Sequence, residues 1–133
     1  MSLFSFSKGI VIASATAFLM ACGGGGSPAD KLMSFYEKSV SILEDNKGDL
    51  DKAAKELEAF MESVKDSARA AKEEADAQYR ALEKDDPAKA KRMEEEFGKR
   101  EEALKVRMEK LRAEVPNFGS HAALQDALEK AHL

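Results

Sequence analysis

Residues 50–84, LDKAAKELEAFMESVKDSARAAKEEADAQYRALEK, decide the fold of this chain. Their apolar residues recur at alternating steps of four and three and form two rows. One row is Leu50, Leu57, Val64 and Ala71, and the other is Ala54, Met61, Ala68, Ala75 and Leu82. This period predicts a helix about 50 Å long with a coiled-coil-like seam. The second half of the seam is mostly alanine, which lets another helix approach closely but buries little apolar area.

The residues that flank this stretch predict its ends and the start of the next helix. Asp49 is suited to cap it, because an Asp side chain accepts hydrogen bonds from the free amides of a first helical turn. Asp85-Asp86-Pro87 ends it, with Asp86 as the next N-cap and Pro87 at the start of a helix over 88–114. Gly98 beside four charged residues weakens the middle of that helix. Its apolar residues recur every seven positions: Ala90, Phe97, Leu104 and Leu111.

Two shorter helices are expected outside this pair. The first begins with Ser27 as N-cap and Pro28 at the first helical position, and Asn46-Lys47-Gly48 is expected to end it in a left-handed cap. The last follows a break at 115–119 and is expected to have Ser120 as its N-cap. Their apolar faces are Leu32, Phe35, Tyr36, Val40 and Leu43 in the first helix, and Leu124, Ala127, Leu128 and Ala131 in the last.

The short connections between these helices determine the predicted architecture, because helices joined by short loops pack as antiparallel neighbours. We predict an all-α fold for residues 29–133. It consists of a long antiparallel helical hairpin with two shorter helices, packed as a small three- or four-helix bundle. The first helix is expected to cover the 50–64 half of the long helix, with the last helix near the same end.

The N-terminal region has a different character. Lys8 is followed by an uncharged apolar run, 9–21, which ends in Leu19-Met20-Ala21-Cys22 and then four glycines. This resembles the signal peptide and lipobox of bacterial lipoproteins, with Leu at −3, Ala at −1 and Cys at +1. Met20 departs from the Ala or Ser that is more usual there. An uncleaved membrane anchor is the alternative, but spanning takes about 20 apolar residues and the run stops at Cys22.

The resemblance implies how the chain is processed and where it is held. Residues 1–21 are expected to be cleaved, and Cys22 to be lipidated with a diacylglyceryl thioether and an acylated amine, palmitate being a typical acyl group. Residues 22–28 then form a Gly-rich tether. The acyl chains are expected to bind the membrane. Stable anchoring generally needs more than one chain, and a fully acylated Cys22 meets that condition. Gly23, where Asp would favour inner-membrane retention, implies the outer membrane facing the periplasm.

Composition narrows the classes of function. The formal net charge is −4, and removing Lys8 with the signal peptide makes it −5. An acidic chain is poorly suited to nucleic acid, which requires a basic surface. Cys22 is the only cysteine, so the domain is expected to have no disulfide.

Two acidic patterns have some of the features of binding or catalytic sites. The segment Asp45–Glu56 places acidic residues where a calcium loop has ligands, but Lys47 and Leu50 occupy its third and sixth positions, so a capped turn is favoured. The acidic runs Glu94–Glu96 and Glu101–Glu102 are interleaved with basic residues at helical spacing, as on a solvated helix face. We predict no catalytic and no metal-binding residues.

The two histidines are potential metal or haem ligands. His121 and His132 are eleven residues apart, about 16 Å along one helix, which is too far to share a metal ion. Met33 and His121 lie near the two ends of the domain, as do the iron ligands of b-type haem bundles, but that likeness is positional only. No cofactor is predicted.

These observations favour a lipid-anchored, non-catalytic helical lipoprotein of the periplasm that acts as a structural or protein-binding module of the cell envelope. Its partner would be an envelope protein, and self-association is possible. The outline is similar to small lipoproteins of the murein-lipoprotein kind, although the C-terminal Ala131-His132-Leu133 lacks their terminal lysine. The alternative is a ligand-binding or chaperone-like helical bundle for haem or an apolar client, motivated by the alanine-rich half of the long helix.

Overall fold

The computed structural model describes residues 26–133, so the predicted signal peptide, Cys22 and the first tether glycines lie outside the described residues. Within 26–133 the regular structure is entirely helical, which confirms the all-α fold class. The helices are α1 (Pro28–Asp45), α2 (Leu50–Asp85), α3 (Pro87–Glu114) and α4 (Ala122–Ala131).

Three of the four helix starts are capped as the sequence predicts. Ser27 and Asp30 form a reciprocal capping box: the Ser27 hydroxyl accepts from the Asp30 amide at 3.3 Å, and the Asp30 carboxylate accepts from the Ser27 amide at 3.0 Å. Asp49 caps α2 and Asp86 caps α3, each accepting a backbone N–H at 3.1 Å. Each cap satisfies an amide that has no partner inside the helix.

Two predicted caps are wrong in detail. Asn46 ends α1 with φ −114°, outside the left-handed region, and its side-chain amide instead donates to the Ile42 carbonyl at 2.9 Å and to Glu56 Oε2 at 2.7 Å. The N-cap of α4 is His121, whose Nδ1 accepts from the Leu124 amide at 3.2 Å. Asn117 explains the shift, because its left-handed φ of 62° turns the chain so that the Ser120 and His121 amides both bond its carbonyl.

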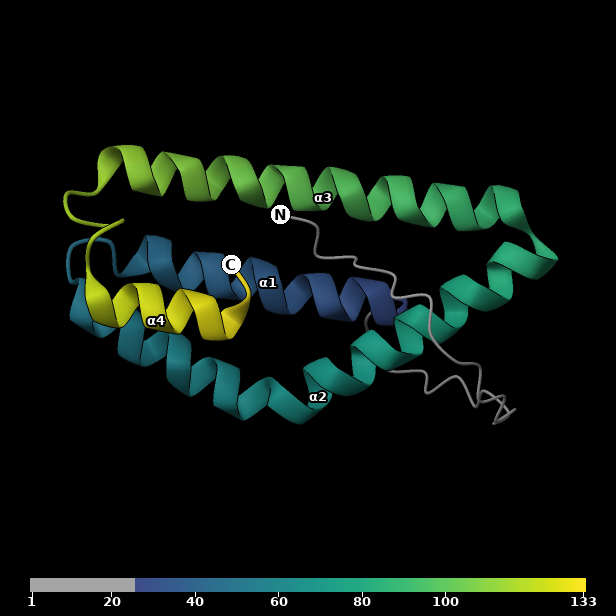
Figure 1. The fold of residues 1–133 in the computed structure, drawn as a ribbon, viewed down its shortest axis with the longest axis horizontal. Helices are drawn as coiled ribbons and strands as arrows, with labels where there is room; N and C mark the ends of the chain where they lie inside the picture. Colours follow the sequence, from purple (N-terminus) through teal and green to yellow (C-terminus); the bar gives the residue numbers. More distant parts are fainter. Residues whose placement is uncertain (1–25) are drawn as a thin grey trace.

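The helices are arranged around α1. Helices α2 and α3 run antiparallel from the Asp86 turn, but their arms diverge, and α1 lies between the first half of α2 and the second half of α3 (Figure 1). Helix α4 packs on the first half of α2, as predicted. Helix α2 bends around α1 rather than running straight (Figure 1).

The core is thickest where all four helices meet. Its fully buried side chains come from α1, α2, α4 and the loop before α4; the largest are Phe118, Met33, Leu43, Leu57, Leu124 and Val40. Towards the Asp86 turn only α2 and α3 face each other, and the buried residues there are mostly small: Ala71, Ala75, Ala90 and Phe97. Val64 and Ala68, in the middle of the predicted seam, are only partly buried. The seam is therefore not closed at that point.

Candidate functional site: a groove between α1, α2 and α4

A groove of about 750 Å³ lies beside the partly buried middle of α2. It is bounded by the first half of α1, the middle of α2 and the end of α4. Its lining residues are Leu32, Phe35, Tyr36, Ser39, Glu58, Met61, Glu62, Lys65, Ala68, Arg69, Lys72, Ala127, Lys130, Ala131 and His132. Its volume is within the range of roughly 300–1,000 Å³ that is typical of small-molecule sites.

The groove has an apolar floor that is held in place by the core. Phe35 packs edge-on against Phe60, with ring centroids 6.5 Å apart. Buried Ser39 donates to the Phe35 carbonyl at 2.8 Å, and its Oγ lies 3.7 Å from Met61 Sδ. The hydroxyl of this polar residue is thus satisfied locally, and the floor presents aromatic and thioether surface. Ala68, two turns from Met61 in the same row of α2, has too short a side chain to fill the space beside them.

Charged side chains form the rim. Lys130 Nζ lies 2.7 Å from Asp126 Oδ2 and 3.0 Å from Glu58 Oε1, and these hydrogen bonds raise the pKa of the Lys130 ammonium. Lys65, Arg69 and Lys72 follow one another at helical spacing on the α2 side of the groove. Among the residues in the structure none of these three forms an ion pair. The rim therefore carries one neutralised cation and a row of three that are not neutralised.

Tyr36 adds a polar group to the floor. The pKa of the Tyr36 phenol is raised above its usual value of 10.0. The main cause is burial of the ring, and the negative charge of Glu101 adds to it. No hydrogen bond to its hydroxyl is formed within residues 26–133. At neutral pH the neutral phenol is thus free to donate to a molecule in the groove.

The arrangement of the groove is suited to binding an amphiphilic molecule. The apolar floor can hold a chain or ring, the cations on the α2 side can orient an anionic group, and the phenol on the floor can donate to an accepting group. In the described part of the chain, no group of three or more His, Cys, Asp or Glu residues is placed to hold a metal ion.

The predicted candidate residues are placed as follows. Cys22, the predicted lipidation site, lies outside the described residues. His121 and His132 are the N-cap and the C-cap of α4, at opposite ends of that helix. His121 Nε2 lies 3.3 Å from Asp51 Oδ1, at the start of α2. Only His132 lines the groove.

The haem-type pairing of Met33 with His121 is not formed. Met33 is fully buried in the core near the start of α1, whereas His121 lies beside the start of α2, which follows the end of α1. The twelve residues from Met33 to Asp45 span about 18 Å along α1. The two side chains are therefore too far apart to hold one iron.

The acidic patterns serve ordinary structural roles. The segment Asp45–Glu56 contains the turn from α1 to α2 and the first two turns of α2, with Asp49 as the N-cap and Glu56 bonded to Asn46. In the α3 runs, Glu95 and Glu102 pair with Lys91 at 3.8 Å and Lys105 at 3.9 Å on an exposed surface. These contacts agree with the capped turn and the solvated face that the sequence favours.

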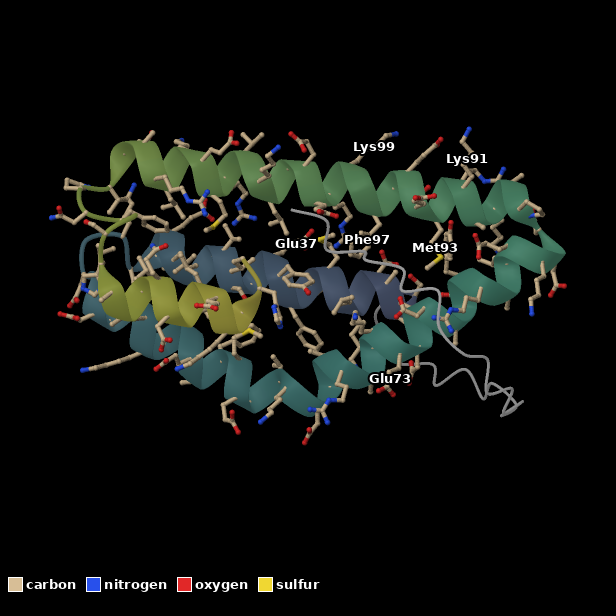
Figure 2. All side chains as sticks on the ribbon, in the orientation of Figure 1. Glu37, Glu73, Lys91, Met93, Phe97 and Lys99 are labelled. Carbon is tan, nitrogen blue, oxygen red and sulfur yellow. The ribbon has the colours of Figure 1, made fainter. Side chains whose placement is uncertain are left out.

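Sequence reasoning missed a polar seam between α1 and α3. Arg100 donates to Asp30 at 2.7 Å and to Glu37 at 3.1 Å, and Arg107 contacts Ser41 at 3.1 Å as well as Glu44. Figure 2 shows Glu37 and Phe97 in the region between α1 and α3, whereas Lys91 and Lys99 point outward. The sequence did contain a signal for this seam. Each arginine stands three positions after a core residue, Phe97 or Leu104, and the two arginines are seven positions apart, so they share one face of α3.

Comparison of the chain with protein-family models, with curated proteins and with solved structures finds no match. Of the helices within 26–133, none is long and apolar enough to cross a membrane.

Proposed function

We propose that this chain is a lipid-anchored, non-catalytic helical module of the bacterial cell envelope, tethered through Cys22 to the outer membrane and facing the periplasm. In this role it acts as a structural element or holds a partner protein of the envelope. Acyl chains on Cys22 supply the membrane affinity, since each buried methylene contributes about 0.8 kcal/mol.

One observation carries the proposal: the helical domain starts immediately after the lipobox-like motif and its glycines. The capping box fixes the first turn of α1 at Ser27, only five residues after Cys22. A chain of this length reaches at most about 17 Å from lipid to helix. The helical bundle would therefore be held close to the membrane surface, where a neighbouring envelope protein can contact it.

Metabolic labelling with an alkyne fatty acid in a bacterial host tests the anchor. We expect the label on the mature chain, an N-terminus at Cys22, and loss of both in Cys22→Ala. Met20→Ala, which brings the motif closer to the usual lipobox, is the matched control and should keep the label. Labelling that persists in Cys22→Ala would overturn the proposal.

Crosslinking in intact envelopes tests the partner. One dominant foreign protein would identify an adaptor and its partner, whereas crosslinks between copies of this chain would indicate a self-associating structural element. Both results agree with the proposed module. An absence of crosslinks would overturn the protein-binding role.

The groove favours a second candidate function, a ligand-binding bundle. Its volume, its aromatic and thioether floor and its cationic rim are features of a small-molecule site. This candidate does not depend on the anchor, because α1, α2 and α4 build the groove without Cys22.

A further inference from the structure

The charge of the groove is opposite to that of the chain. Its lining contains four cations, Lys65, Arg69, Lys72 and Lys130, and two anions, Glu58 and Glu62, so it carries a formal charge of +2 in a protein of −4. Lys130 is already neutralised by Glu58 and Asp126. The three cations of α2 face the groove without an ion-pair partner in the described residues. The electrostatic field at this side of the groove therefore favours an anion.

The three cations are distributed along the groove. From Lys65 to Lys72 the helix rises about 10 Å, so the three positive charges lie along about 10 Å of the groove. Long basic side chains lay their methylene stems on apolar surface and keep their charged ends at the solvent edge. The combination presents an apolar wall topped by positive charge, with the Tyr36 phenol as a donor on the floor.

The size of the groove distinguishes between two occupants of this chemistry. A helical peptide about 10 Å in diameter would fill 750 Å³ in about 10 Å, less than two turns, which limits its contacts to a single interval from i to i+7. A single alkyl chain with an anionic head is a small molecule, and the groove volume lies within the range of small-molecule sites.

We propose that the groove binds the anion of a free long-chain fatty acid, with its carboxylate at Arg69, between Lys65 and Lys72, and its alkyl chain on the floor formed by Phe35 and Met61. This inference rests on the second candidate function and is independent of the acylation of Cys22. Bidentate pairing of a carboxylate with the guanidinium of Arg69 gives the head-group contact its direction.

The test measures displacement of a fluorescent fatty acid, dansyl-undecanoate, from the full-length chain carrying Cys22→Ser, which cannot be acylated. Oleate and oleyl alcohol, which share the alkyl chain and differ in head charge, are the two competitors, used below their micelle concentrations. We expect one saturable site and displacement by oleate at about a tenfold lower concentration than by oleyl alcohol, the usual size of a charge-assisted contact.

A charge-reversal pair identifies the site. K65E/R69E should weaken oleate binding by about tenfold or more. The matched control R92E/K99E makes the same two changes at exposed positions of α3, outside the groove, and should leave binding unchanged. Ala68→Phe, which fills the groove from α2, should weaken both oleate and oleyl alcohol. Circular dichroism of each variant establishes that it is folded.

Other outcomes would overturn the inference. Equal displacement by oleate and oleyl alcohol would show that the anionic head group does not contribute to binding. An equal loss of oleate binding in K65E/R69E and R92E/K99E would show that only the net charge of the protein matters. Uptake of haem or of an acidic amphipathic peptide without uptake of oleate would keep a binding function but reject the fatty acid. Oleate binding that is lost in the acylated wild-type chain would make the chain's own acyl group the occupant.

Discussion

Phe118 gives the sharpest test of how the bundle is held together. It lies in the loop between α3 and α4, yet only 1% of it is exposed, and it belongs to the same core cluster as Leu111 and Leu124. Burying a Phe removes about 150–250 Å² from water, worth roughly 4–6 kcal/mol at about 25 cal/mol per Å². Because Ala retains the Cβ, we expect Phe118→Ala to lower the free energy of unfolding by about 4 kcal/mol, within the range of measured Phe→Ala changes.

Urea unfolding followed by circular dichroism at 222 nm measures this loss. A small domain has about 5–15 kcal/mol in total, so the variant should unfold at a much lower urea concentration with a similar slope. Val106→Ala is the matched control, since Val106 on α3 is 57% exposed and its truncation should change stability by no more than about 0.5 kcal/mol. A loss below about 1 kcal/mol in Phe118→Ala would refute the view that this loop is part of the core.

Three further predictions concern the polar seam, the loop and the groove. Arg100→Met should lower the free energy of unfolding by about 1 kcal/mol, because it removes the hydrogen bonds to Asp30 and Glu37 of α1. Urea titrations at low and high ionic strength should show a smaller loss in high salt. A loss that does not depend on salt would indicate that the Arg100 side chain acts through packing instead. Asn117→Gly should be nearly neutral, whereas Asn117→Val should cost about 1–2 kcal/mol, because φ is 62° there; equal midpoints in thermal unfolding would contradict this reading. In a Tyr79→Phe background, absorbance at 295 nm should show Tyr36 titrating above 10.0. Folding favours the neutral phenol, so its contribution to stability is present below pH 10.0 and is lost as the pH rises through the folded-state pKa; Tyr36→Phe should flatten that decline, and an unchanged slope would argue against the assignment.

The fold was largely predictable because local rules and the apolar period agree. Ser27, Asp49 and Asp86 stand directly before Pro28, Leu50 and Pro87, so the caps and the first turns are specified by adjacent residues. The period of the apolar residues in α2 predicts one long helix, and the short loops predict antiparallel neighbours. Each of these inferences needs information from only a few positions along the chain.

The remaining features depend on residues far apart in the sequence. Arg100 binds Asp30, seventy positions away, and only the packing of α1 between the hairpin arms brings the two together. Phe118 follows a helix-ending segment and has no periodic partner, so its burial depends on the left-handed Asn117. The groove lies beside the middle of α2, where this helix bends around α1 (Figure 1). The spacing of the apolar residues in α2 predicts one long helix but not its bend.

The groove also exists because small residues stand where three helices meet. Where α1, α2 and α4 meet, the small side chains of Ala68, Ala127 and Ala131 line the same space as Phe35 and Met61. Ala127 and Ala131 are already buried, whereas Ala68 is only partly buried. A larger side chain at Ala68 would fill part of this space and raise stability, since burying a large apolar side chain is worth about 1.5–3 kcal/mol. A ligand that fills the same space recovers part of that energy through binding, by about 2.7 kcal/mol at a hundred times its Kd. A bundle that binds the proposed ligand would be more stable when loaded than when empty, and the cations along α2, which form no ion pair within residues 26–133, would favour anionic amphiphiles for that gain.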